Sequence, residues 1–175
     1  KLKTTLKNCI SMTETNQEND FFWPELFSKL KLKDPAVLNG KSINSFRYSL
    51  NDNEFIRIWM KSAIYLNKEE IVIKLLKYLP KRAYSSPSIR ELIGLIYYRT
   101  GSMEKSYSFV EDLNTPNAEN IKGNINLQEK KYELAFGHFK LALNKKNNSL
   151  NALERVIPLA WILGLWDEGL SFIKY

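Results

Sequence analysis

Apolar residues recur with the period of an α-helix along most of the chain from Asn53 onward. The first apolar stripe consists of Phe55, Ile56, Trp59, Met60, Ala63, Ile64 and Leu66. A second stripe runs from Ile71 to Leu79, after a tight turn that Asn67 and Lys68 predict. Apolar residues three and four positions apart line one face of a helix. No run alternates in the period of a strand, so the sequence predicts an all-α fold without a sheet.

Capping residues and prolines divide the helical region into pairs. Ser86-Pro87 and Thr115-Pro116 each place a capping side chain before a proline. Proline suits the first turn of a helix, because its missing N–H would have no partner there. Gly101 ends the helix that follows Ser86. The predicted helix pairs are residues 53–84, 87–115, 116–149 and 150–175.

The first fifty residues differ from this pattern. Residues 1–20 are basic and then polar, with no apolar period, and they predict a flexible N-terminal segment. Residues 21–52 are richer in aromatic side chains, with Phe22, Leu26, Phe27 and Leu30 near helical spacing. We expect this second segment to form a helical cap or a degenerate repeat.

Small and bulky residues recur at a fixed interval in the second half of the chain. The pattern consists of Gly123, Tyr132, Ala135, Phe139 and Ala142. It returns further along the chain, at the same internal spacing, with Ile157, Trp166 and Gly169. Two packed antiparallel helices need a small residue where their axes approach and a bulky one where space remains.

This recurrence resembles the tetratricopeptide repeat, a stack of helix-turn-helix units of about 34 residues. In that family the eighth, twentieth and twenty-seventh positions are small, and Gly123, Ala135 and Ala142 occupy them here. The resemblance implies an α-α superhelix, or solenoid, over residues 53–175. Such stacks usually hold other molecules.

The neighbouring units match the family pattern less completely. Gly94 falls at the eighth position and Gly101 at the turn of the preceding unit, which reaches Gly123 too early and is therefore shortened. Gly164 falls at the turn of the last unit, and Met60 at the eighth position of a weaker first unit. The departures in the best unit are Asn126, Lys130 and Asn147, which replace an aromatic residue, the turn glycine and a proline.

The resemblance also implies a concave binding surface along the first helix of each unit. Carried over by position, the groove candidates are Asn117, Asn120, Asn124, Gln128, Glu91, Tyr98, Arg99 and Trp161. The four amide side chains are spaced to share one helix face, and an amide can hold an extended peptide backbone. The alternative is that Asn117 or Asn120 caps a helix, and that the aromatic residues are buried between units.

The formal net charge of +7 comes mostly from lysine. Scattered lysines on solvated helix faces explain it better than a nucleic-acid surface, because no arginine-rich or aromatic-basic motif is present. The single cysteine and single histidine, Cys9 and His138, form no metal-binding pattern. We interpret His138 as a surface or groove-edge residue, and we expect no cofactor and no metal.

No glycine-rich phosphate loop, nucleophile motif or other reactive constellation occurs in the sequence, so we expect no enzyme. The sequence favours a non-catalytic scaffold or adaptor that binds another protein, as one section of a larger assembly. The alternatives are a small chaperone for an exported or assembly subunit and a basic helical repeat that binds nucleic acid.

No apolar run is long enough to cross a membrane, and no signal peptide is visible, which slightly favours the cytoplasm. The chain does not begin with Met and stops inside a predicted helix, so we expect a fragment or a processed form. An apolar C-terminal end then predicts self-association.

Overall fold

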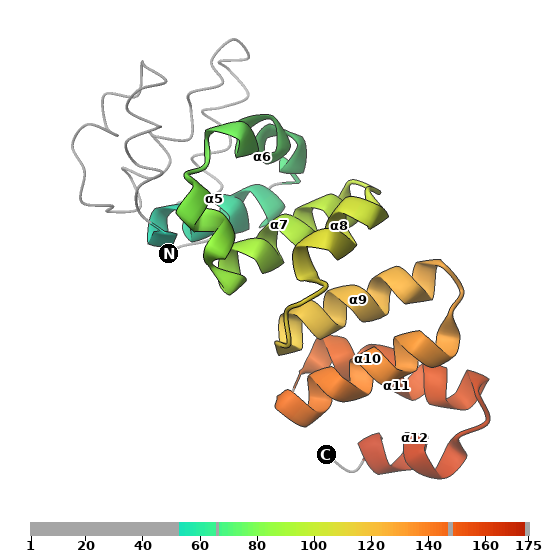
Figure 1. Ribbon diagram of the computed structural model, residues 1–175. Helices are drawn as coiled ribbons and strands as arrows, with labels where there is room; N and C mark the ends of the chain where they lie inside the picture. The colour runs from blue at the N-terminus through green and yellow to red at the C-terminus, as the bar shows by residue number, and fades with distance from the viewer. Residues whose placement is uncertain (1–52, 66, 147–148, 174–175) are drawn as a thin grey trace. The chain divides into compact units, whose positions relative to one another are not determined.

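The computed structural model describes residues 53–65, 67–146 and 149–173, and all of its regular structure is helical (Figure 1). This confirms the predicted all-α class, and no strand occurs in the described residues. The segments predicted for residues 1–20 and 21–52 lie outside the described part of the chain. The α-helices are α5 (Asn53–Tyr65), α6 (Glu69–Leu75), α7 (Pro87–Arg99), α8 (Met103–Val110), α9 (Pro116–Gln128), α10 (Tyr132–Lys145), α11 (Leu150–Ile162) and α12 (Trp166–Ile173). Two short 3-10 helices, η1 (Leu76–Tyr78) and η2 (Lys81–Ser85), follow α6.

The helices alternate in regular pairs along the chain. The helices α5, α7, α9 and α11 each have 13 residues. They begin at Asn53, Pro87, Pro116 and Leu150, so the first and third intervals are equal and the middle interval is shorter. We call these four the A helices, and the helices that follow each of them, α6, α8, α10 and α12, the B helices.

The turn between the A and B helices is also repeated. Two residues after each A helix, the backbone adopts a positive φ, at Asn67, Gly101, Lys130 and Gly164. The B helix begins two residues later in every case. Glycine has no Cβ and takes this conformation freely, whereas a lysine is strained there.

The chain divides into two compact parts, residues 1–92 and 93–175, with the boundary inside α7. In the first part, Ile56, Trp59, Met60 and Ala63 bury one face of α5, and α6 packs against that helix. The hydroxyl of Tyr84 donates a hydrogen bond of 2.9 Å to the carbonyl of Leu76 and so joins η2 to η1.

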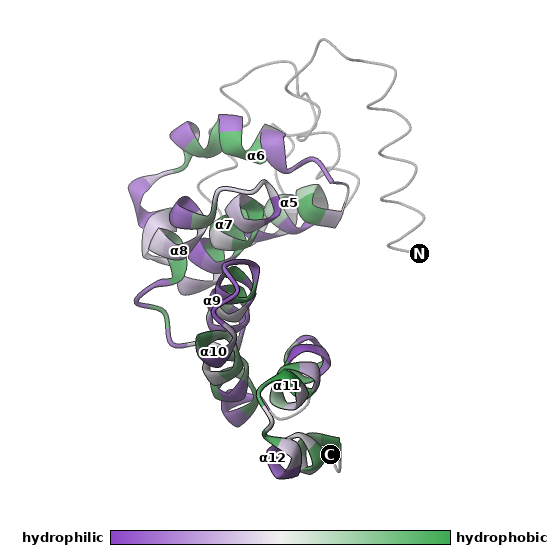
Figure 2. Ribbon diagram, turned by 90° about the vertical axis from the view of Figure 1, so that its right-hand side faces the viewer, coloured by the Kyte–Doolittle hydropathy of each residue, from purple (hydrophilic) through white to green (hydrophobic). Residues whose placement is uncertain are grey.

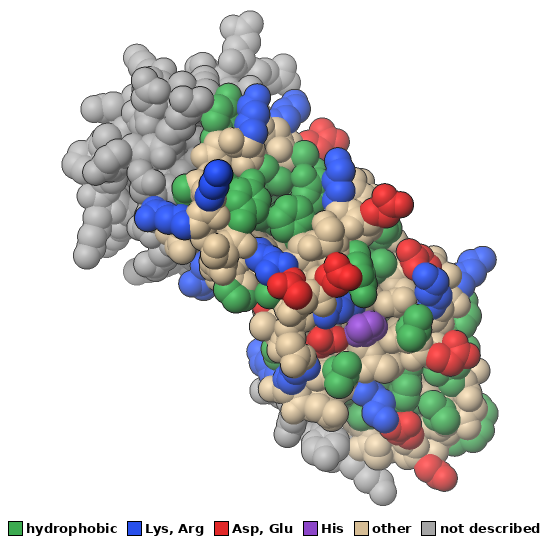
Figure 3. All heavy atoms as spheres, viewed as in Figure 1, with side chains coloured by type: hydrophobic (Ala, Val, Ile, Leu, Met, Phe, Trp, Pro, Cys, Tyr) green, Lys and Arg blue, Asp and Glu red, His purple; other side chains and the backbone are tan. Residues whose placement is uncertain are grey.

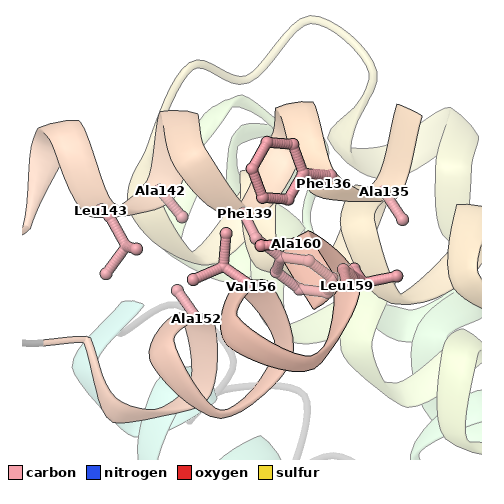
Figure 4. Close-up of a cluster of buried hydrophobic side chains, with 9 residues drawn as sticks. All are labelled: Ala135, Phe136, Phe139, Ala142, Leu143, Ala152, Val156, Leu159 and Ala160. Atoms are coloured by element: carbon pink, nitrogen blue, oxygen red, sulfur yellow. The ribbon is translucent and has the colours of Figure 1, made fainter. Parts of the chain in front are cut away.

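In the second part, each helix from α8 to α12 packs on the next helix along the chain. One apolar core joins α8 to α9 and consists of Val110, Leu113, Ala118, Ile121 and Ile125. A larger core joins α10 to α11 (Figure 4) and consists of Ala135, Phe136, Phe139, Ala142, Leu143, Ala152, Val156, Leu159 and Ala160. Tyr132 is partly buried against this larger core.

Small residues lie where paired helices approach most closely. A Cβ added to Gly123 would lie 2.8 Å from the ring of Phe139, and one added to Gly94 would lie 2.7 Å from Val110. A Cβ on Gly169 would lie 3.2 Å from both Ala160 and Trp161. The A and B helices of these three pairs therefore approach more closely than a larger side chain at these glycines would allow.

Side chains also fix the helix ends and crossings. The hydroxyl of Thr115 accepts a hydrogen bond from the backbone N–H of Ala118 at 3.2 Å, and Pro116 follows in the first turn of α9. This is the cap-plus-proline arrangement predicted from the sequence. At the α7–α8 crossing, the buried hydroxyl of Ser106 donates to the carbonyl of Gly94 at 2.7 Å.

We predict opposite effects for alanine at two glycines of the third helix pair. Gly123→Ala should lower the free energy of unfolding by about 1–3 kcal/mol, because its methyl group would overlap Phe139. Gly137→Ala should raise it by about 0.5–1 kcal/mol, because nothing lies within 4 Å of the added Cβ and alanine favours the helix. Chemical denaturation followed by circular dichroism measures both. Equal effects at the two sites would contradict the close crossing.

The turn at Lys130 gives a second prediction. Lys130→Gly should raise the free energy of unfolding by about 0.5–1 kcal/mol, because relief of the left-handed strain outweighs the added chain entropy. Gly101→Ala is the matched control and should lower it by about 1 kcal/mol, since its φ is +81°. If Lys130→Gly were destabilising, lysine would not be strained at this turn.

Candidate functional site: a buried charged cluster and an exposed apolar face

Four charged or titratable side chains meet at the α9–α10 pair and form what we call the charged cluster. The carboxylate of Glu119, almost fully buried, accepts a hydrogen bond from Nδ1 of His138 at 2.8 Å. Its other oxygen lies 3.4 Å from Nζ of Lys122 and 3.9 Å from Nζ of Lys145. Lys122 is buried too, and it donates to the carbonyl of Leu113 at 2.9 Å.

Polar residues extend the charged cluster on both sides. The ammonium of Lys145 also donates to the side-chain oxygen of Asn114, in the loop before α9. Asn126, one turn beyond Lys122, is buried and donates to the carbonyl of Lys122 at 2.9 Å. The helix α9 is thus more polar than α11 (Figure 2). Both are A helices that pack between two other helices, α9 between α8 and α10 and α11 between α10 and α12.

The same positions of the other described helix pairs are mostly apolar. Counted from the start of each A helix, Lys122 corresponds to Trp59, Ile93 and Val156, which are all fully buried. Counted in the same way, Glu119 corresponds to Ile56, Arg90 and Leu153. Counted from the start of each B helix, His138 corresponds to Leu75, Phe109 and Phe172. Among the described pairs, only the third therefore places a lysine where the other A helices bury an apolar side chain, whereas the counterparts of Glu119 and His138 are buried or half-buried.

Burial makes this replacement costly. Taking a charged group out of water costs several kcal/mol even after the surroundings relax, and the attraction between paired charges often fails to recover it. The cluster combines two lysines with one carboxylate, and His138 remains about a quarter exposed. Figure 3 shows charged side chains of both signs beside the histidine, drawn in purple.

The geometry defines what the charged cluster can do chemically. With its Nδ1–H directed at Glu119, a neutral His138 carries its lone pair on Nε2, on the opposite edge of the ring. The partly exposed Lys145 ammonium adds a positive charge beside it. The arrangement therefore offers one hydrogen-bond acceptor, Nε2, and one cationic donor, the Lys145 ammonium. The sequence predicts His138 only as a surface or groove-edge residue, and it does not predict a role for Glu119, Lys122 or Lys145.

The amide residues predicted for the groove lie along one stripe of α9, but they differ in exposure. Asn117 and Gln128 are exposed, and Asn124 is half-buried. Asn120 is buried, and its amide nitrogen donates to the hydroxyl of Ser149 at 3.3 Å, just before α11. Its side-chain oxygen is buried without a hydrogen bond. Asn120 therefore joins α9 to the start of α11. Asn117, Asn124 and Gln128 are more accessible to a partner than Asn120.

The other groove candidates lie on α7 and α11. Glu91 is half-buried in the first compact part, and Arg99 is exposed at the end of α7 in the second. Tyr98 is partly buried against the core that joins α8 to α9. Trp161 is 49% exposed, and its ring meets that of Trp166 edge to face at 5.2 Å.

The last helix pair exposes apolar side chains, which we call the α12 apolar face. Trp166, Leu170 and Ile173 follow one another at helical spacing on α12 and are 54%, 49% and 57% exposed. Trp161 of α11 continues this surface through its contact with Trp166. On another side of α12, Phe172 meets Phe136 edge to face, and Glu168 pairs with Lys140.

Comparison with known proteins identifies no family for this chain. A scan against protein-family models gives no match, and a search of curated proteins finds no match either. Among the described residues, no helix has the length and apolar character to cross a membrane. The same residues contain no group of three or more histidine, cysteine, aspartate or glutamate side chains placed to hold a metal ion.

We predict that the charged cluster lowers stability relative to an apolar core. Glu119→Leu alone should lower the free energy of unfolding by about 3–5 kcal/mol, because it leaves the buried Lys122 without its carboxylate. The triple variant Glu119→Leu/Lys122→Val/His138→Phe, which copies the fourth helix pair, should be as stable as the wild type or up to about 4 kcal/mol more stable. Thermal and chemical denaturation measure both variants. A triple variant less stable than Glu119→Leu would show that the cluster is needed for folding.

Proposed function

We propose that the protein is a non-catalytic interaction module that binds another protein and serves as one section of a larger assembly. The observation that carries this proposal is the α12 apolar face, where two tryptophans and two aliphatic side chains are about half exposed. Isolated apolar residues are normal on a protein surface, but a cluster that contains tryptophans is typical of interaction sites.

The repeated helix pairs support the same proposal. Stacked helix pairs present side chains at a fixed spacing, and their neighbour-to-neighbour packing keeps such a surface rigid. In our proposal the pairs form a tetratricopeptide-like superhelix, and the exposed or half-buried amides Asn117, Asn124 and Gln128 line a second contact surface. Beside another face of α9, the partly exposed Lys145 of the charged cluster would pair with an acidic group of the partner.

The proposal predicts that charge on the α12 apolar face abolishes binding. Trp166→Glu/Leu170→Glu should weaken the interaction at least tenfold, since a central tryptophan often contributes about 2 kcal/mol or more to binding. Leu134→Glu is the matched control, because Leu134 is 57% exposed on α10 and lies outside this face. The measurement is quantitative capture from extract, followed by calorimetry with the purified partner.

Two results would contradict the proposal. If wild-type protein captured no partner that binds saturably after purification, the chain would not be an interaction module under those conditions. If both glutamate variants retained the same partner equally, the α12 apolar face would not be the binding site. Circular dichroism of each variant checks that the helices remain folded.

A further inference from the structure

The α12 apolar face matches a surface that is covered elsewhere in the same chain. When α10 and α12 are aligned at their first residues, Tyr132 and Trp166, Phe136 corresponds to Leu170 and Phe139 to Ile173. Phe136 and Phe139 are buried in the core that joins α10 to α11, with Phe139 also against Gly123 of α9, whereas their counterparts on α12 are about half exposed. The residue types are apolar in both helices, but of the two only α10 is followed, in the described part of the chain, by an A helix that packs on it.

The chain itself shows what covers such a face. Ala152, Val156 and Leu159 of α11 belong to the same apolar core as Phe139, Ala142 and Leu143 of α10 (Figure 4). One helix pair earlier, Ala118 and Ile125 of α9 pack on α8 with Val110 and Leu113. Each covering helix thus places an alanine and, seven residues later, a leucine or isoleucine on the B helix before it.

We infer that the α12 apolar face receives an amphipathic α-helix from a partner protein, packed as α11 packs on α10. This inference rests on the proposed function and adds the kind of partner. The partner helix carries a small residue, which allows close approach, and a leucine or isoleucine seven residues later. Trp166 and Trp161 would border that helix as Tyr132 borders α11.

A second copy of this chain fits the face less well. The residues that a copy would have to offer are the covering residues of its own A helices. In the described part of the chain these residues are already buried. Three of them, Ile89, Ala118 and Ala152, hold the first of the two covering positions, and the other three, Ile96, Ile125 and Leu159, lie seven residues later. A copy would have to open its own core before it could supply them.

An extended segment is also a poorer occupant. A helix surface offers no free backbone groups, so an extended chain lying on α12 would leave its own N–H and C=O groups without partners where it is buried. A helix satisfies its backbone internally and exposes only side chains to the contact. The geometry therefore points to a helical partner.

The test uses a fluorescein-labelled, stapled helical peptide as the probe. It carries Ala, Val and Leu at the positions of Ala152, Val156 and Leu159, with charged residues elsewhere. We expect saturable binding to the 175-residue protein in fluorescence anisotropy. Leu170→Glu/Ile173→Glu should weaken this binding at least tenfold, and Leu134→Glu should leave it unchanged. A probe with glutamate at the leucine position is the control for nonspecific adhesion.

The outcomes separate this inference from the proposed function. If the probe does not bind, but a captured partner binds α12 through an extended segment, the inference is wrong and the interaction function stands. If sedimentation shows a dimer that Leu170→Glu/Ile173→Glu dissociates and the probe does not bind, a second copy covers the face and the inference is again wrong. If neither the probe nor any protein binds, both proposals are wrong.

Discussion

The close approach of paired helices is the constraint on which the rest of the structure depends. At Gly123 the ring of Phe139 occupies the space that any larger residue would fill, and Gly94 and Gly169 have the same role in their own pairs. Close packing at these crossings leaves little freedom in the rotation of each B helix. That rotation decides which side chains are covered by the next A helix and which remain exposed.

The third helix pair shows that this packing tolerates a polar interior when every charge has a partner. Glu119 has three cationic or imidazole partners from α9 and α10, and Lys122 has a backbone carbonyl as well. The first and fourth pairs carry apolar residues at the positions of Glu119, Lys122 and His138, so helix packing does not require the charged cluster.

Much of the fold could be predicted because its signals are local. These signals are the helical period, a cap followed by proline, and small residues at fixed intervals, and each depends on a few neighbouring positions. They predicted Thr115 as a helix cap and Gly123 as the small residue of a close crossing. The charged cluster joins Glu119 to side chains of the next helix, which only the packing of α10 on α9 brings together. Asn120 was predicted to face a partner, but its burial depends on where Ser149 lies. A comparison of the helix pairs, position by position, would have shown Lys122 and His138 as exceptions.

The turn between the A and B helices has a consequence for how the chain can change in length. Its spacing is the same in all four described pairs, although its central residue is Asn, Gly, Lys or Gly. The shorter middle interval arises after this turn, in the pair that contains α8. Among the described pairs, the difference in length therefore lies between the start of the B helix and the following A helix. The A helix and its turn have one length throughout, so a redesigned chain could be lengthened or shortened after the start of a B helix without altering the crossing at the glycines.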